Sequence, residues 1–79
     1  MRIQVLFFGA TVAITGTRRR EMGLSSESTA RTVFDKILAE HPRLTGHKLH
    51  FSVNQEFATG EEMLTDGDEL AVFTAVSGG

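Results

Sequence analysis

A single helical stripe, set between segments patterned as strands, is the strongest constraint on the fold of this 79-residue chain. Its apolar residues recur at i, i+3, i+4, i+7 and i+8, the spacing of one face of an α-helix: Ala30, Val33, Phe34, Ile37 and Leu38. Residues 25–28 are rich in capping types, and Pro42 marks the end because the residue before a proline disfavours helical geometry. One such helix covers one face of a sheet, so we expect two layers.

The remaining patterned segments read as strands. β-Branched, aromatic or alternating residues occupy them, and turn-forming residues separate them, notably Asn54-Gln55 and 65–68. Residues 18–24 are mostly charged, which favours an edge strand in a hairpin with the first segment. Residues 10–16 fit either a turn of helix or a loop. The predicted strands, in chain order, are 2–8, 18–24, 49–54, 56–58 and 69–74.

This order of elements predicts an α+β fold, the ubiquitin-like β-grasp, with a mixed sheet packed on one main helix. If the first and last strands are neighbours they must be parallel, because no hairpin can join them. Within the first strand, alternation places Leu6 and Phe8 on the face opposite the expected core. A strand buried on one side would carry polar residues there, so this apolar outer face needs an explanation.

Size and composition exclude several classes of protein. The length allows one domain, residues 1–79, and folding buries roughly 60% of the surface of a chain this small, which leaves little room for an enclosed active site. The absence of cysteine excludes disulfides, thiolate zinc sites and a cysteine nucleophile. The net charge of −2 argues against a general nucleic-acid or membrane binder. The short apolar start is no signal peptide, so a cytoplasmic location is expected.

The polar residues offer weak candidate sites. His41, His47 and His50 lack metal-ligand spacing and are interpreted as solvated surface histidines. Turn chemistry explains 66–68 better than a calcium site does. The arginine run 18–20 fits a solvated face better than a phosphate or acidic-partner contact. The serines at 25–28 lack a histidine base at a recognisable spacing, and no hydrolase motif is present.

The diglycine Gly78-Gly79 stands out against this background. Glycines have no side chain, so a segment ending in them can thread a channel that excludes other residues. Extended, residues 74–79 reach roughly 20 Å, enough to deliver the α-carboxylate of Gly79 into another protein's active site. The alternative interpretation is an ordinary small, disordered terminus.

With these features the chain resembles the MoaD/ThiS family of ubiquitin-like sulfur carriers, and within it the small subunit of molybdopterin synthase. The resemblance spans nearly the whole chain and is carried by residues 5–10, 51–56, 64–73 and 76–79. The last two stretches are the most specific. The chain departs from the family pattern at Thr74-Ala75, where prolines are common.

The resemblance implies a mechanism. A MoeB-like activating enzyme would use ATP to adenylate the Gly79 carboxylate, and sulfur transfer would convert it to a thiocarboxylate. The tail would then enter a MoaE-like large subunit and donate sulfur to cyclic pyranopterin monophosphate. This chain would bind no permanent cofactor and no metal, and it would be a non-catalytic sulfur-donor subunit, since the large subunit would hold the acid–base residues.

The resemblance also explains the outer face of the sheet. Leu6 and Phe8 would share it with Ala71 and Phe73, and an apolar patch on a small domain is typical of a docking surface. The partner-binding residues implied are Leu6, Phe8, Phe73, Val76 and Ser77, with Gly78 and Gly79 as the reacting end. Alternatives left open are a sulfur carrier for thiamine, cysteine or another thiolated product, a ubiquitin-like protein modifier, and a plain interaction module. Self-association without the partner is also open.

Overall fold

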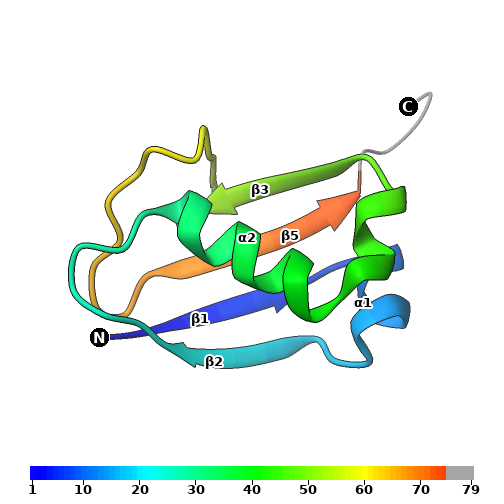
Figure 1. The fold of residues 1–79 in the computed structure, drawn as a ribbon, viewed down its shortest axis with the longest axis horizontal. Coiled ribbons are helices and arrows are strands. Elements are labelled where there is room, and N and C mark those ends of the chain that lie inside the picture. Colours follow the sequence, from blue (N-terminus) through cyan, green and yellow to red (C-terminus); the bar gives the residue numbers. More distant parts are fainter. Residues whose placement is uncertain (75–79) are drawn as a thin grey trace.

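The predicted helix packs across one face of a five-stranded sheet (Figure 1). The computed structural model describes residues 1–74. In chain order the elements are β1 (Arg2–Phe7), α1 (Ala10–Thr15), β2 (Arg19–Gly23), α2 (Ala30–Glu40), the 3₁₀ helix η1 (Pro42–Gly46), β3 (Leu49–Val53), β4 (Glu56–Phe57) and β5 (Glu69–Thr74).

The sheet order is β2-β1-β5-β3-β4, so the first and last strands lie side by side at its centre. They are parallel, with Leu6 opposite Ala71 and Phe7 opposite Val72, while every other pairing is antiparallel. The mixed sheet, the parallel central pair and the edge position of β2 are confirmed.

The helix α2 begins and ends close to the predicted positions. Thr29 is its N-cap and accepts a hydrogen bond from the backbone N–H of Thr32 at 3.4 Å, and His41 is its C-cap before Pro42. Residues 25–28 therefore lead up to the cap without supplying it, and the Ser28 hydroxyl instead donates to the Ser25 carbonyl. The expectation of a cap within that stretch is wrong by one residue.

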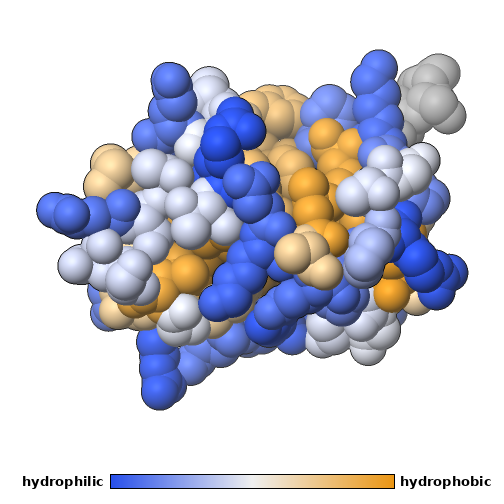
Figure 2. Space-filling model, in the orientation of Figure 1, coloured by the Kyte–Doolittle hydropathy of each residue, from blue (hydrophilic) through white to orange (hydrophobic). Residues whose placement is uncertain are grey.

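The core lies between α2 and the inward face of the sheet. The central strands contribute alternate residues that are almost fully buried, and α2 contributes its predicted stripe, with Leu38 only partly buried. Hydrophilic side chains gather over the exposed side of α2, with hydrophobic residues visible between them (Figure 2). The buried core residues are Ile3, Val5, Phe7, Met22, Ala30, Val33, Phe34, Ile37, Leu44, Leu64, Leu70 and Val72.

Three local features differ from the sequence prediction or resolve it. The first strand ends at Phe7, because Gly9 has φ 61° and turns the chain into α1, which settles the alternatives for residues 10–16. The element η1 was not predicted, although its buried Leu44 completes the core. The turn between β3 and β4 places both Asn54 and Gln55 at positive φ.

Among residues 1–74, no helix is long and apolar enough to cross a membrane.

Candidate functional site

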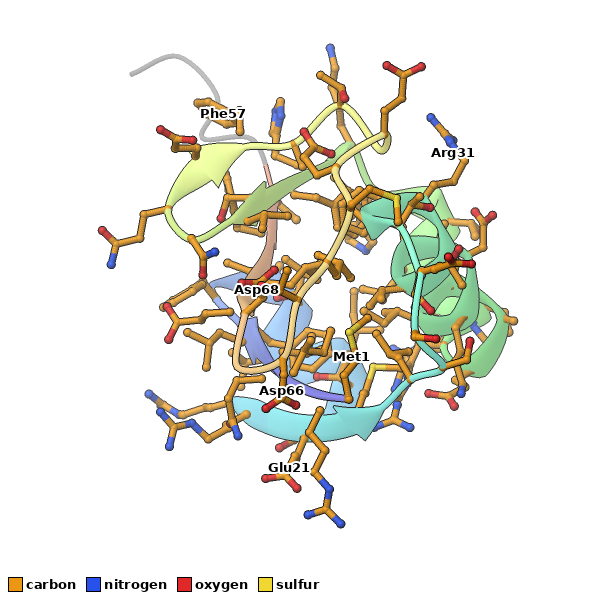
Figure 3. The ribbon with its side chains drawn as sticks, turned by 90° about the vertical axis from the view of Figure 1, so that its left-hand side faces the viewer. Met1, Glu21, Arg31, Phe57, Asp66 and Asp68 are labelled. Carbon is orange, nitrogen blue, oxygen red and sulfur yellow. The ribbon has the colours of Figure 1, made fainter. Side chains whose placement is uncertain are left out.

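The face of the sheet turned away from α2 carries the candidate site. Figure 3 shows the two layers from the side, with Phe57 on the sheet side and Arg31 on the helix side. Directly paired residues of neighbouring strands project to the same face, so the strand register defines rows of side chains across this surface. We call its apolar part the outer patch: Leu6, Phe8, His50, Phe57, Ala71 and Phe73.

The middle row crosses all five strands. Leu6 of β1 lies opposite Arg19 on one side and Ala71 on the other, and Ser52 of β3 pairs with both Ala71 and Phe57. The row therefore begins with a charged residue at the β2 edge and ends with an aromatic residue at the β4 edge.

An aromatic cluster lies where β5 ends. Phe73 is paired with His50, and their rings stack at a centroid distance of 5.7 Å and an interplanar angle of 24°. Phe57 meets the same two rings, at 5.9 Å from His50 and 6.0 Å from Phe73. Phe57 is 75% exposed, which is unusual for an aromatic side chain in a folded domain. Such a cluster offers a partner a large, preassembled apolar contact.

The local backbone fixes Phe8 beside this cluster. The Phe8 N–H donates to the Val72 carbonyl at 3.1 Å, and the buried Thr11 hydroxyl lies 2.6 Å from the Phe8 carbonyl and 3.1 Å from that of Val72. Gly9 permits the positive φ that this turn requires. Phe8 remains 51% exposed and, with Phe73, Gly9 and Thr74, lines an open apolar groove of about 300 Å³. The groove adjoins the last described residue of β5.

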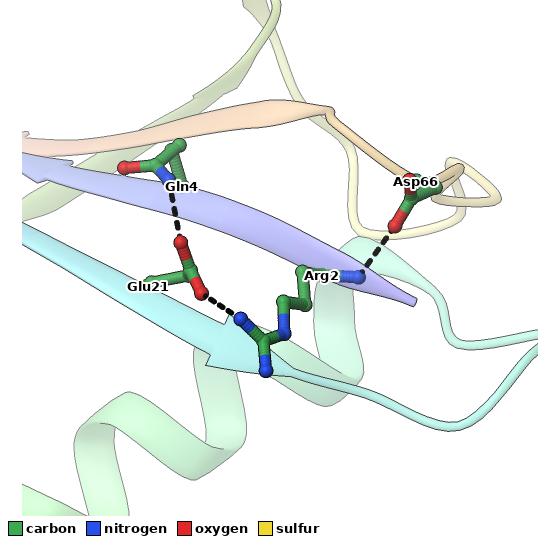
Figure 4. A network of polar contacts seen from close by, with 4 residues as sticks. All are labelled: Arg2, Gln4, Glu21 and Asp66. Carbon is green, nitrogen blue, oxygen red and sulfur yellow. Dashed lines mark hydrogen bonds and ion pairs between the residues drawn. The ribbon is translucent and has the colours of Figure 1, made fainter.

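Polar residues bound the outer patch at the opposite end of the strands (Figure 4). The Arg2 guanidinium contacts the Glu21 carboxylate at 2.7 Å, and the Gln4 amide donates to the same carboxylate at 3.3 Å. The Arg2 backbone N–H donates to Asp66 at 2.7 Å. These groups satisfy one another, so the face is apolar at the end of β5 and polar at its start.

The turn that leads into β5 is held by Asp68. Its carboxylate accepts from the Thr65 backbone N–H at 2.8 Å and from the Asn54 side-chain amide at 3.0 Å. The Thr65 N–H, followed by the Asn54 amide, lowers the pKa of the Asp68 carboxyl below its ordinary value. Gly67 has φ 87°, so turn chemistry at 66–68 is confirmed.

The structure brings together Leu6, Phe8 and Phe73, the three predicted partner-binding residues within the described range, and Ala71 joins them. Val76, Ser77, Gly78 and Gly79 lie outside the described residues. Sequence reasoning missed His50 and Phe57. Strand alternation carried the signal for His50, since its neighbours Leu49 and Phe51 face the core.

The histidines differ partly from expectation. His47 is exposed, as predicted for a solvated residue, whereas His41 and His50 are half-buried against aromatic rings. Within residues 1–74, no three His, Asp or Glu side chains are grouped closely enough to hold a metal ion. The described face offers instead a cluster of rings beside an open apolar groove.

Comparison with known proteins identifies the relatives of this chain. The family model described as "ThiS family" matches residues 5–79. The molybdopterin synthase sulfur carrier subunit of Mycobacterium tuberculosis is 33% identical over 82 residues, which cover 100% of this chain and 99% of that protein. The chain belongs to the ThiS family.

Solved structures share the fold of this ThiS-family chain. SAMP1 from Haloferax volcanii is 26% identical, with a TM-score of 0.84 and complete coverage of both chains. A complex of subunits 1 and 2 of the molybdopterin-converting factor from Helicobacter pylori contains a chain that matches with a TM-score of 0.71, 22% identity and complete coverage of both chains. The ubiquitin-like β-grasp fold is thereby confirmed.

Proposed function

We propose that this ThiS-family chain is the sulfur carrier subunit of a molybdopterin synthase. The observation that carries the proposal is the full-length similarity to a protein of that name, at 33% identity. The outer patch supports it, because a carrier must present itself to other proteins and this face is apolar and preassembled beside the end of β5.

The reacting group in this proposal is the α-carboxylate of Gly79. A carboxylate is a poor electrophile, so an activating enzyme first joins it to AMP from ATP and releases pyrophosphate. Sulfide-level sulfur then displaces AMP and leaves a thiocarboxylate, which donates its sulfur to cyclic pyranopterin monophosphate and returns to the Gly79 carboxylate. ATP serves the activating enzyme, and the carrier holds no permanent cofactor. We place this chemistry in the cytoplasm.

The partner proposed for the transfer step is the large subunit of the synthase. Subunit 1 of the Helicobacter pylori factor was solved together with subunit 2, and this chain shares the fold of a chain in that complex. Residues 75–79 follow β5 directly, so a partner seated on the outer patch lies next to the start of the tail. The tail residues Val76, Ser77 and Gly78 would then contact the large subunit as Gly79 enters it.

Intact-mass spectrometry tests the proposal. The chain is made with its activating enzyme, ATP and a sulfur donor, and its mass should rise by the difference between sulfur and oxygen. A variant lacking Gly79 is the control: it should gain no sulfur and unfold at the same temperature, since a terminal residue contributes little to packing. Sulfur loading of the shortened chain would contradict the assignment of the reacting group.

A protein modifier is the second candidate function. SAMP1 is named as a small archaeal modifier protein, and its structure matches this chain over its whole length. A modifier forms isopeptide bonds with lysines, so incubation with the activating enzyme and cell extract would give a ladder of conjugates. A carrier gives the mass change alone.

A further inference from the structure

The run of three arginines is divided by the structure. Arg20 lies opposite the buried Val5, and it pairs with Glu40 at the end of α2. Arg19 projects to the other face, where it lies opposite Leu6 of the outer patch. Arg20 therefore faces another element of this chain, whereas its neighbour Arg19 faces the docking surface.

Arg19 is a positively charged residue of that face, as its register opposite Leu6 shows. The nearest acidic neighbour on β2, Glu21, is already bound to Arg2 and Gln4 (Figure 4). Across residues 1–74, the ion pairs are Arg2–Glu21 and Arg20–Glu40, so Arg19 has no ion-pair partner in the described part of the chain. It is exposed, at the edge of an apolar surface, in a chain of net charge −2.

We propose that Arg19 orients the docked partner by binding a carboxylate at the rim of the partner's apolar docking patch. The inference rests on the proposed function, because it takes the large subunit of molybdopterin synthase as the partner seated on the outer patch. It adds the chemistry that this partner must present: an apolar centre over Phe73 and an Asp or Glu opposite the β2 edge.

The position of Arg19 gives this contact its strength. A guanidinium presents planar, paired N–H donors that match both oxygens of one carboxylate. Leu6 is its direct cross-strand neighbour, so docking over Leu6 would remove water from one side of the ion pair and reduce screening. The apolar side chains of the outer patch alone would allow the partner to dock in several orientations, whereas a charge at one edge favours one of these orientations.

The experiment measures binding of the full-length chain to the purified large subunit of molybdopterin synthase from the same organism. Arg19→Glu is compared with Arg43→Glu, which makes the same charge change at an exposed residue of η1, on the layer of α2. We expect Arg19→Glu to weaken binding by about 10- to 100-fold at low salt and the difference to shrink as salt rises, since a charge at an interface rim acts through screened electrostatics. Arg43→Glu should stay within about threefold of wild type, because it changes only the net charge.

A conservative variant separates charge from geometry. Arg19→Lys keeps the charge but loses the paired donors, so its affinity should fall between wild type and Arg19→Glu. All variants should unfold at the wild-type temperature, since Arg19 is exposed.

Three results would overturn the inference. Equal affinities for Arg19→Glu and Arg43→Glu, with wild-type binding intact, would remove the role of Arg19 and leave the proposed function standing. Failure of the wild-type chain to bind the large subunit would refute the partner itself. A wild-type chain that forms dimers which Arg19→Glu dissociates would assign the residue to contact between copies.

Discussion

Truncation of Phe73 tests whether the outer patch is the docking surface. The Phe73 ring stacks on His50 at 5.7 Å, lies 6.0 Å from Phe57 and lines the groove with Phe8, so it is the member shared by the cluster and the groove. Central aromatic anchors typically contribute about 2–4 kcal/mol to binding, which corresponds to roughly 30- to 1,000-fold in Kd. Phe73→Ala should weaken binding to the large subunit by that factor.

The same substitution should leave the fold intact. Phe73 is only partly buried, so truncation removes a limited buried apolar area together with the contacts between the rings. The folding free energy should therefore fall by about 1–2 kcal/mol. A small domain is stable by about 5–15 kcal/mol, so the variant stays folded.

Calorimetric titration and urea unfolding of the same samples give the two values. Phe57→Ala serves as a graded control, because this residue is 75% exposed and lies at the β4 edge, where contacts contribute less than at the centre. The docking hypothesis would be refuted by Phe73→Ala binding with wild-type affinity, or by a loss of binding fully explained by unfolding.

Three further substitutions, one of them with a matched control, test the local arguments. Asp68→Ala should destabilise the chain by about 1–2 kcal/mol at neutral pH, because the Thr65 N–H loses its acceptor. Since the folded-state pKa of Asp68 is lowered, this contribution is present above the unfolded-state pKa and is lost as pH falls through the folded-state value. The stabilities of wild type and variant should therefore converge below about pH 4 in acid unfolding curves. Gly60→Ala should cost about 1–2 kcal/mol in thermal unfolding, because Gly60 has φ 106°, whereas Gly23→Ala, at a site without positive φ and with open space, should cost far less. Phe34→Ala opens a cavity beneath α2 and should cost about 3–5 kcal/mol in urea unfolding while the molecules that remain folded still bind the large subunit, which separates core from docking residues.

The sequence predicted those parts of the fold that depend on regular spacing. The stripe from Ala30 to Leu38 places α2, and the alternation around Val5 and Val72 places the central strands on their buried faces. These patterns are repeated over several residues, so tertiary contacts reinforce them. Leu6 and Phe8 were correctly assigned to the outer face for the same reason.

Features of the fold that depend on a single residue were harder to predict from the sequence. Gly9 ends β1 one residue early, and η1 is a short helix whose only deeply buried residue is Leu44, so neither leaves a periodic signal. Phe57 was placed in a short return, but its position beside Phe73 depends on a tight turn with two positive φ angles. Such a turn lacks the Asn-Gly signature that would have predicted its geometry.

The central position of β5 has a consequence for the order of folding. Leu70 and Val72 are fully buried between β1 and β3, so the sheet has no continuous centre until the last of its strands has been synthesised. Pairing β1 with β5 also closes a loop of most of the chain, which makes folding depend on a long-range contact. A product cut short before Glu69 would expose the edges of β1 and β3 and be a substrate for proteases. The architecture therefore makes folding depend on translation through β5, which ends at Thr74, four residues before the diglycine begins.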